Sequence, residues 1–453
     1  MNTSSYKKYP VFIKVGKAHN SRIRTTKEKP MSETVETPQY STQATPPKDR
    51  DALLRQAEQI ISNVLRGGVL LSAGIIFLGL ILLLIKGPGN GDFPHTIPET
   101  WQRIVQLNPY GVIVLGLIVL LFTPVLRVMV AVIAFAIEGD RQYVTITLFV
   151  LLILLFSIIV LGAMANANIP AHESSTNLEF FSLIFASSLI AGLIGALVGL
   201  GGGVLVVPIL TLAFHMPINI AIGASIVSVI ATSSGAAAAY VRDHLTNLRV
   251  GMFLEIATTL GAITGALVVA VIPTQALFVI FGAVLLISAA PLVIKLGEEL
   301  PQHVTNDRFA KQLSLASSYP DAKLGLVEYQ VTHVPAGFSM MYVAGLISGL
   351  LGIGSGTFKV LAMDTAMKLP MKVSSTTSNF MIGVTAAASA GIYFQRGDID
   401  PMIAAPVALG VLIGALVGAK TLTKLTNSTI RKIFVPVLAI VAIEMLLRGF
   451  FNI

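Results

Sequence analysis

A few charged side chains stand inside long apolar stretches of this sequence, where a charge is costly unless it has a partner or a function. Lys359 is the best candidate for holding an anion, and Asp364 follows it closely enough to pair with it or with Lys368. Glu255 and Asp364 are candidates for proton coupling, because burial favours the protonated form of a carboxyl group. Placement at the membrane interface, near Arg249, is the competing interpretation for Glu255.

Two glycine-rich clusters could bring backbone close to a ligand. The candidate substrate-binding residues in them are Gly201, Gly202 and Gly203 in the first cluster, and Gly354, Ser355 and Gly356 in the second. A helix that starts directly after such a cluster points free N–H groups and its positive dipole end at the bend, which suits an anion. Packing of helices through small residues is the alternative interpretation.

Hydroxyl and amide side chains follow both clusters and could donate hydrogen bonds to an oxyanion. The residues expected to line the site are Ser225, Thr232, Ser378, Asn379 and Thr385. The competing interpretation is that these side chains bond to carbonyl groups of their own helices.

The clusters belong to a duplicated sequence. Gly192–Gly203 and Gly345–Gly356 are related by an ungapped offset of 153 residues, and the same offset places Ser225 on Ser378. A match that continues over this length indicates an internal repeat.

The composition is that of a polytopic membrane protein. Of 453 residues, 54% are hydrophobic and 12% are charged, whereas soluble domains carry about 25% charged residues. Several apolar runs exceed the roughly 20 residues that cross a bilayer. The sequence has no cysteine, no paired histidines at metal-ligand spacing and no nucleophile–base pair. We therefore expect no metal, no cofactor and no enzymatic activity.

The N-terminal part divides into a polar leader and a membrane module. Residues 1–50 are expected to be disordered, and residues 1–30 carry eight basic side chains against one acidic one, most of the net charge of +8. Met31 is an alternative start. Residues 51–165 are expected to form a three-span accessory domain, in which 51–66 is an interfacial helix that leads into the first span.

Arg127 lies in the second of these three spans. An arginine at membrane depth should face a partner, and Glu138, Asp140 or a neighbouring helix could supply one. Snorkelling of the side chain to the cytosolic surface is the alternative.

Basic residues in the loops predict the topology, because lysine and arginine favour the cytoplasmic side. They predict repeat one at 178–295, a cytosolic linker at 296–337 and repeat two at 338–453. Each repeat would be a glycine-broken helical hairpin plus three spans, so the two would have opposite orientations. The predicted fold is thus an all-α polytopic membrane protein with two inverted-topology repeats, a construction of secondary transporters. The N-terminus would be cytoplasmic and the C-terminus external.

Two motifs, Leu200–Gly203 and Ile353–Gly356, each open one half of the duplication, and Pro217 and Pro370 follow them. In these features and in the hydroxyl-rich helices, residues 178–453 resemble the TauE/SafE family of sulfite and organosulfonate exporters. The resemblance implies a multi-pass transporter of the prokaryotic plasma membrane for small sulfur-containing or carboxylate anions. The second motif has Ser355 where the first has glycine, so the halves are not identical.

The N-terminal module carries a second resemblance. The segments Ile61–Arg66, Thr123–Val128 and Glu138–Thr145 are similar to a three-span domain of unknown function that is found beside or fused to this family. The resemblance implies no activity. We expect an accessory module that packs against the transporter or recruits a partner.

Together these features predict a secondary transporter that exports a small anion, sulfite or an organosulfonate, by alternating access between the repeats. As partners we expect the anion and the lipid bilayer, with a homodimer as an allowed assembly, and no nucleic acid. An anion channel, or a membrane sensor or scaffold without transport, is the alternative.

Overall fold

The computed structural model describes residues 48–87, 97–161, 178–198, 202–293, 304–321, 325–422 and 427–451. In chain order its elements are α1 (Lys48–Lys86), α2 (Ile97–Val105), α3 (Pro109–Ile137), α4 (Arg141–Phe156), η1 (Ser157–Leu161), α6 (Leu178–Val198), α7 (Gly203–Pro208), η2 (Ile209–Ala213), α8 (Ile218–Arg242), α9 (Leu248–Val268), η3 (Val269–Val271), α10 (Thr274–Val293), α11 (Arg308–Gln312), β1 (Ser317–Asp321), β2 (Gly325–Tyr329), α12 (Val334–Leu351), α13 (Gly356–Leu361), η4 (Ala362–Ala366), α14 (Met371–Gln395), α15 (Pro401–Leu422) and α16 (Asn427–Phe451). The first 47 residues, to which most of the predicted leader belongs, lie outside the described residues.

The protein is an all-α polytopic membrane protein. Within the described ranges, seven helices are long and apolar enough to cross a membrane. The helix α14 has a comparable length of 25 residues but is rich in hydroxyl side chains, and most of its residues are buried. Because neighbouring helices surround it, α14 needs no apolar surface toward lipid.

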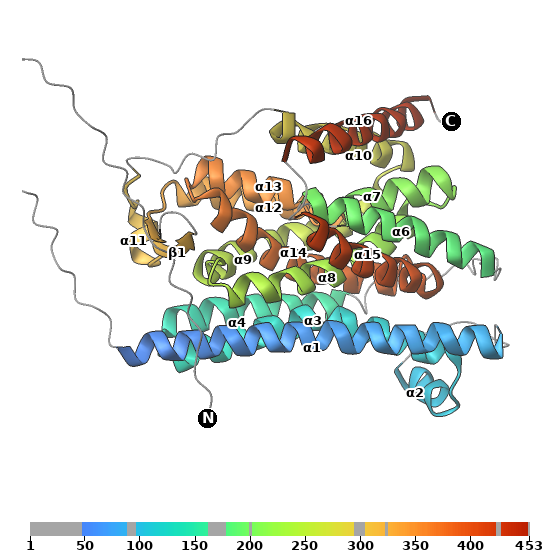
Figure 1. Cartoon of the computed structure of the whole chain (residues 1–453), viewed down its shortest axis with the longest axis horizontal. Coiled ribbons are helices and arrows are strands. Elements are labelled where there is room, and N and C mark those ends of the chain that lie inside the picture. Colours follow the sequence, from blue (N-terminus) through green and yellow to red (C-terminus); the bar gives the residue numbers. More distant parts are fainter. Residues whose placement is uncertain are drawn as a thin grey trace, which may run out of the picture. The chain divides into compact units, whose positions relative to one another are not determined.

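The N-terminal module is built on α1 and α3, which lie side by side (Figure 1). The helix α1 has 39 residues and includes the segment 51–66, which the sequence assigns to an interfacial helix that leads into the first span. The glycine pair that follows this segment does not end the helix. A Cβ atom at Gly68 would lie 2.8 Å from the Thr123 side chain, so this glycine permits close approach of α3.

The same order of elements occurs twice in the transporter half, which we define as residues 178–453. The short helix α7 starts at Gly203 and α13 starts at Gly356, and each passes into a π-helical turn, η2 or η4. The starts of both short helices, both π-helical turns and the following helices α8 and α14 are separated by 153 residues. The duplication seen in the sequence is therefore also a duplication of local structure.

The two copies exchange their first helices. The helix α6 packs against α15 of the second copy, and α12 packs against α9 of the first. A Cβ atom at Gly192 would lie 2.2 Å from the Val411 carbonyl oxygen, and one at Gly345 would lie 2.2 Å from the Thr258 carbonyl oxygen. These two contacts are related by the same offset, so the packing is reciprocal, as in an interface with two-fold symmetry. The orientation of each copy relative to the membrane stays a prediction.

The helix break in the second copy is a tight left-handed turn. Gly352 and Gly354 have φ angles of +67° and +73°, and Ser355 has a φ of +46°. In the first copy Gly202, the counterpart of Ser355, has an ordinary right-handed φ of −64°. Ser355 is a non-glycine residue in a strained conformation, so the two breaks differ in backbone as well as in sequence.

The reciprocal glycine contacts should set the stability of the transporter half. Gly345→Ala and Gly192→Ala would each push a methyl group against backbone, and we expect a loss of about 1–3 kcal/mol. Thermal unfolding of the purified protein in detergent measures this loss. Gly235→Ala is the matched control, because its nearest non-local atom would be 3.9 Å away. A control as damaging as the other two would contradict the packing argument.

Candidate functional site

Three buried side chains from three helices form a continuous hydrogen-bonded chain. Lys359 Nζ on α13 donates to Thr385 Oγ1 on α14 at 2.6 Å, and Thr385 Oγ1 donates to Glu255 Oε1 on α9 at 2.7 Å. The relative exposure of each residue is 1% or less. Because Glu255 belongs to the first copy and the other two belong to the second, this chain joins the two repeats.

The lysine position follows from the helix break. The strained turn ends at Ser355, and α13 begins at Gly356. Lys359 lies three residues after this start. The Thr385 hydroxyl also lies 3.0 Å from the Met381 carbonyl oxygen. Since it has one proton, it either bonds to its own helix or donates to Glu255. Thr385 can therefore switch between two acceptors.

Arg127 from the N-terminal module enters the same core. The residue is fully buried, and its Nη2 donates to Ser234 Oγ at 2.9 Å while Nη1 donates to the Phe380 carbonyl oxygen. The guanidinium carbon lies 5.1 Å from the centroid of the Phe380 ring. Snorkelling, one of the two sequence-based alternatives for Arg127, is wrong.

The acidic residues proposed as partners of Arg127 bind another arginine. Asp140 Oδ2 lies 2.9 Å and Glu138 Oε2 lies 3.6 Å from Nη2 of Arg249. Arg127 instead faces neighbouring helices, the third partner that the sequence offered. Glu255 is buried and accepts a hydrogen bond from Thr385 rather than pairing with Arg249, and its depth in the membrane stays a prediction.

We call Arg127, Glu255, Lys359 and Thr385 the charged centre. Both Lys359 and Arg127 interact electrostatically with Glu255. Two cations and one carboxylate give a formal charge of +1 in a region without solvent. Buried charges are tolerated only when they are paired and hydrogen-bonded, and Glu255 Oε2 and Arg127 Nε have no hydrogen-bond partner among the described residues. Among the described residues the centre thus keeps one unused donor, Arg127 Nε, and one unused acceptor, Glu255 Oε2.

The two helix breaks meet at Ser225. Its hydroxyl lies 2.8 Å from the carbonyl oxygen of Gly352 and 3.1 Å from that of Gly203. Ser378, its counterpart, donates to the Gly356 carbonyl oxygen at 3.1 Å. These two predicted lining residues bind the backbone of the breaks. The nearby Ser355 hydroxyl is buried and has no hydrogen-bond partner within the described part of the chain.

Other predicted site residues do not join the charged centre. Thr232 Oγ1 donates to the Ser228 carbonyl oxygen at 3.0 Å, and Asn379 Nδ2 donates to the Ser375 carbonyl oxygen at 3.1 Å. Both satisfy their own helices, as the competing interpretation proposed. Asp364 lies half-buried on η4 and interacts with Lys368 rather than with the lysine of the centre.

The glycine candidates divide in the same way. Gly203, Gly354 and Gly356 are buried at the breaks, where a Cβ atom would lie within 3.0 Å of another side chain. Gly202 packs against the Val411 side chain. Gly201 lies outside the described residues. Close packing therefore accounts for these glycines, and their contact with a ligand stays a prediction.

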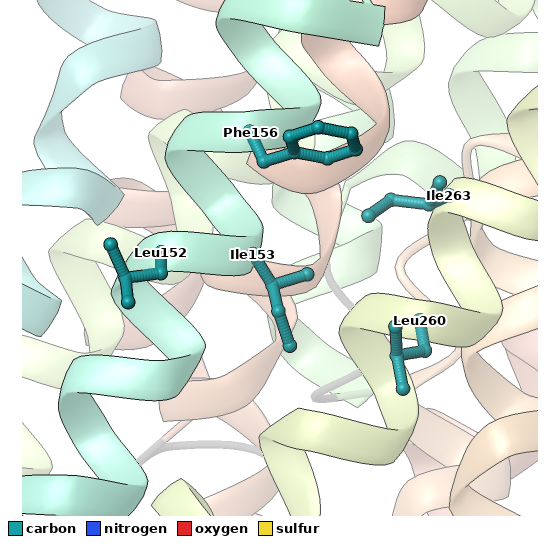
Figure 2. A pocket seen from close by; sticks show the side chains of 5 residues that line it. All are labelled: Leu152, Ile153, Phe156, Leu260 and Ile263. Carbon is teal, nitrogen blue, oxygen red and sulfur yellow. The ribbon is translucent and has the colours of Figure 1, made fainter.

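An open apolar pocket lies away from the charged centre, between α4 and α9. Figure 2 shows its lining, Leu152, Ile153, Phe156, Leu260 and Ile263, and its volume is about 320 Å³. No charged or polar side chain lines it, so it has nothing to recognise an anion. Its lining matches the acyl chains of lipid.

Sequence reasoning found the components of the centre but not their assembly. Lys359, Thr385 and Glu255 were each candidates, whereas Arg127 was expected to belong to a separate module. The signal for Arg127 was its charge in the middle of a 29-residue apolar helix. Ser234, which accepts its hydrogen bond, was one hydroxyl among many and carried no distinguishing signal.

A buried charged centre between two broken-helix repeats is a construction found in secondary transporters. The chain belongs to the TauE/SafE family, because the family model described as "Sulfite exporter TauE/SafE" matches residues 184–445. A second model, "Protein of unknown function (DUF1634)", matches residues 61–159. Both resemblances inferred from the sequence are confirmed.

Curated relatives agree with this class. The probable membrane transporter protein YunE of Bacillus subtilis (strain 168) is 26% identical over 279 residues, which cover 60% of this chain and 99% of the relative. The probable membrane transporter protein YdhB of the same organism is 27% identical, covering 52% of this chain and 89% of the relative. The probable membrane transporter protein ORF9 of Sinorhizobium sp is 23% identical, and the alignment covers 60% of this chain and 92% of the relative. No solved structure matches.

The buried charges should be energetically coupled. Lys359→Met leaves the Glu255 carboxylate without its bridged cation, and breaking such a pair should destabilise the protein by about 3–5 kcal/mol. Lys359→Met combined with Glu255→Gln should restore most of that stability, because no unpaired charge remains. Unfolding of the four proteins in detergent gives the coupling energy.

Thr385→Val tests the bridge separately. We expect a loss of about 1–3 kcal/mol, since both charged neighbours lose a hydrogen bond. Ser389→Ala on the same helix is the control, because among the described residues that buried hydroxyl bonds to the Ala386 carbonyl oxygen of its own helix alone. Equal losses of unfolding free energy for the two variants would show that the bridge stabilises the protein no more than an ordinary hydroxyl bond within a helix does.

Proposed function

We propose that this transporter exports a small anion, sulfite or an organosulfonate, by alternating access between its two repeats. The observation that carries the proposal is the charged centre with its formal charge of +1, which joins α9 of the first repeat to α13 and α14 of the second. An oxyanion offers several acceptor atoms. The cations of the centre could donate hydrogen bonds to these atoms, and so could the unpartnered hydroxyl of Ser355, which lies four residues before Lys359. Membership of a family of sulfite exporters supports this class of substrate.

Alternating access is supported by the closure of the centre. Arg127, Lys359 and Thr385 have no exposed surface, so an anion can enter or leave only after helices separate. The swapped packing of α6 on α15 and α12 on α9 gives two equivalent interfaces at which the repeats could move against each other. A channel would need a continuous open path through the same helices.

Coupling is proposed to run through Glu255 and Thr385. The Thr385 hydroxyl bridges Lys359 and Glu255, so a proton on the carboxylate would change the charge that an anion meets. The membrane potential also favours exit of an anion, by about 2.3 kcal/mol per charge per 100 mV.

The proposed location is the prokaryotic plasma membrane, with the N-terminus in the cytoplasm and the C-terminus outside. The basic linker residues Arg308 and Lys311 on α11 support a cytosolic linker, because lysine and arginine favour that side. The bilayer and the anion are the proposed partners, and a homodimer stays a prediction.

Uptake of labelled sulfite into inverted vesicles tests the function. We expect saturable, protein-dependent uptake that organosulfonates compete, and acceleration by sulfite on the opposite side. Lys359→Met should raise the half-saturating concentration about tenfold or more, because a charged hydrogen bond to the anion is lost. Ser389→Ala should behave like wild type. Uptake that never saturates would favour a channel, and unchanged affinity in Lys359→Met would remove the lysine from the site.

Glu255→Gln tests the coupling. A neutral side chain cannot carry the proton, so a proton gradient should no longer drive accumulation, while exchange of sulfite across the membrane should persist. Measuring exchange and gradient-driven uptake in the same vesicles separates the two processes. Proton-driven accumulation that survives the substitution would exclude Glu255 as the coupling group.

A further inference from the structure

We propose that the N-terminal module is a working part of the transport site, and that its Arg127 gives the charged centre its net positive charge. Glu255 and Lys359 alone would neutralise each other. With Arg127 fully buried in the same core and interacting electrostatically with Glu255, one formal positive charge remains for an anion. Arg127 is therefore a positioning residue that acts through Glu255, and this inference rests on the proposed function for the identity of the anion.

The geometry places Arg127 inside the transporter half. Its guanidinium group bonds to Ser234 on α8 and to the Phe380 carbonyl oxygen on α14, and it interacts electrostatically with Glu255 on α9. It thus connects three helices from both repeats. A residue that only attached the module to the outside would not reach the helices that carry the centre.

The transporter half departs from its own internal symmetry where the arginine enters. A Cβ atom at Gly383 would lie 3.3 Å from both Nη atoms of Arg127 and 2.5 Å from Ser233 Oγ. The position that corresponds to Gly383 in the first copy is Ile230, and the position that corresponds to Ser234 in the second copy is Ala387. Space and a hydrogen-bond acceptor for a guanidinium group are therefore present on one side only.

Buried polar contacts hold the module in this position. Ser62 Oγ donates to the Ala238 carbonyl oxygen at 2.7 Å, Ser157 Oγ donates to the Ala388 carbonyl oxygen, and Tyr143 Oη donates to the Leu313 carbonyl oxygen at 2.7 Å. The contacts reach α8, α14 and the linker between the repeats. Such a docked surface can hold a guanidinium group at a fixed distance from the centre.

A relative of transporter-half length shows what the module adds. The alignment with YunE runs over 279 residues and covers 99% of that protein but 60% of this chain. YunE is therefore too short to match both residues 61–159 and residues 184–445 of this chain. In the present chain, fusion supplies the arginine to each transporter half in a one-to-one ratio.

Charge compensation tests the proposal. Arg127→Met reduces the formal charge of the centre from +1 to 0, and Arg127→Met with Glu255→Gln returns it to +1. We expect sulfite binding to the purified full-length protein to weaken about tenfold in the single variant, to recover within about threefold in the double variant, and to be largely kept in Arg127→Lys. In vesicles, the single variant should raise the half-saturating concentration more than it lowers the maximal rate.

Arg249→Met is the matched control, because Arg249 also joins the module to the transporter half but pairs with Asp140 and Glu138 away from the centre. It should leave sulfite affinity unchanged. The proposal is overturned if Arg127→Met binds sulfite like wild type, or if the folded double variant fails to recover binding. Absence of sulfite binding by the wild type would instead contradict the proposed substrate. In that case thermal unfolding of the single and double variants at Arg127 and Glu255, which needs no ligand, still tests the proposal. A coupling energy near zero would overturn it.

Discussion

The burial of one carboxylate and two cations in a core with almost no solvent-exposed surface is the constraint on which the structure depends. Glu255, Lys359 and Arg127 come from α9, α13 and α3, and none of these helices could keep its charge buried alone. Their shared burial therefore constrains how the two repeats and the N-terminal module fit together. The hydroxyl of Thr385 completes the set by bridging lysine and glutamate.

Glycines allow the tight turns and close helix packing that this core requires. At the breaks, positive φ angles at Gly352 and Gly354 let the chain turn and restart a helix three residues before Lys359. Along the swapped interfaces, Gly192 and Gly345 let helices approach until backbone touches backbone. Ser225 then ties the two breaks together through both carbonyl groups. Close packing accounts for these small residues, which is why glycine patterns alone do not distinguish a binding site from a helix interface.

Exact internal symmetry would not produce this site. The centre takes its carboxylate from one copy and its lysine and threonine from the other, and the strained Ser355 has no strained counterpart at Gly202. The guanidinium group enters beside Gly383, where the first copy has Ile230. Duplication supplied a two-fold framework, and divergence of a few positions made one polar, asymmetric centre within it.

The sequence by itself determined the class of fold, the duplication, the family and the location of the helix breaks, because apolar length, repeated spacing and glycine clusters are local properties. It also marked Lys359, Glu255 and Thr385 as separate candidates. Only the tertiary structure decided that they touch, that Thr232 and Asn379 bond to their own helices, and that Arg127 leaves Glu138 and Asp140 to Arg249. These outcomes depend on which helices pack together, since a buried charge selects its partner by distance in space rather than by separation along the chain.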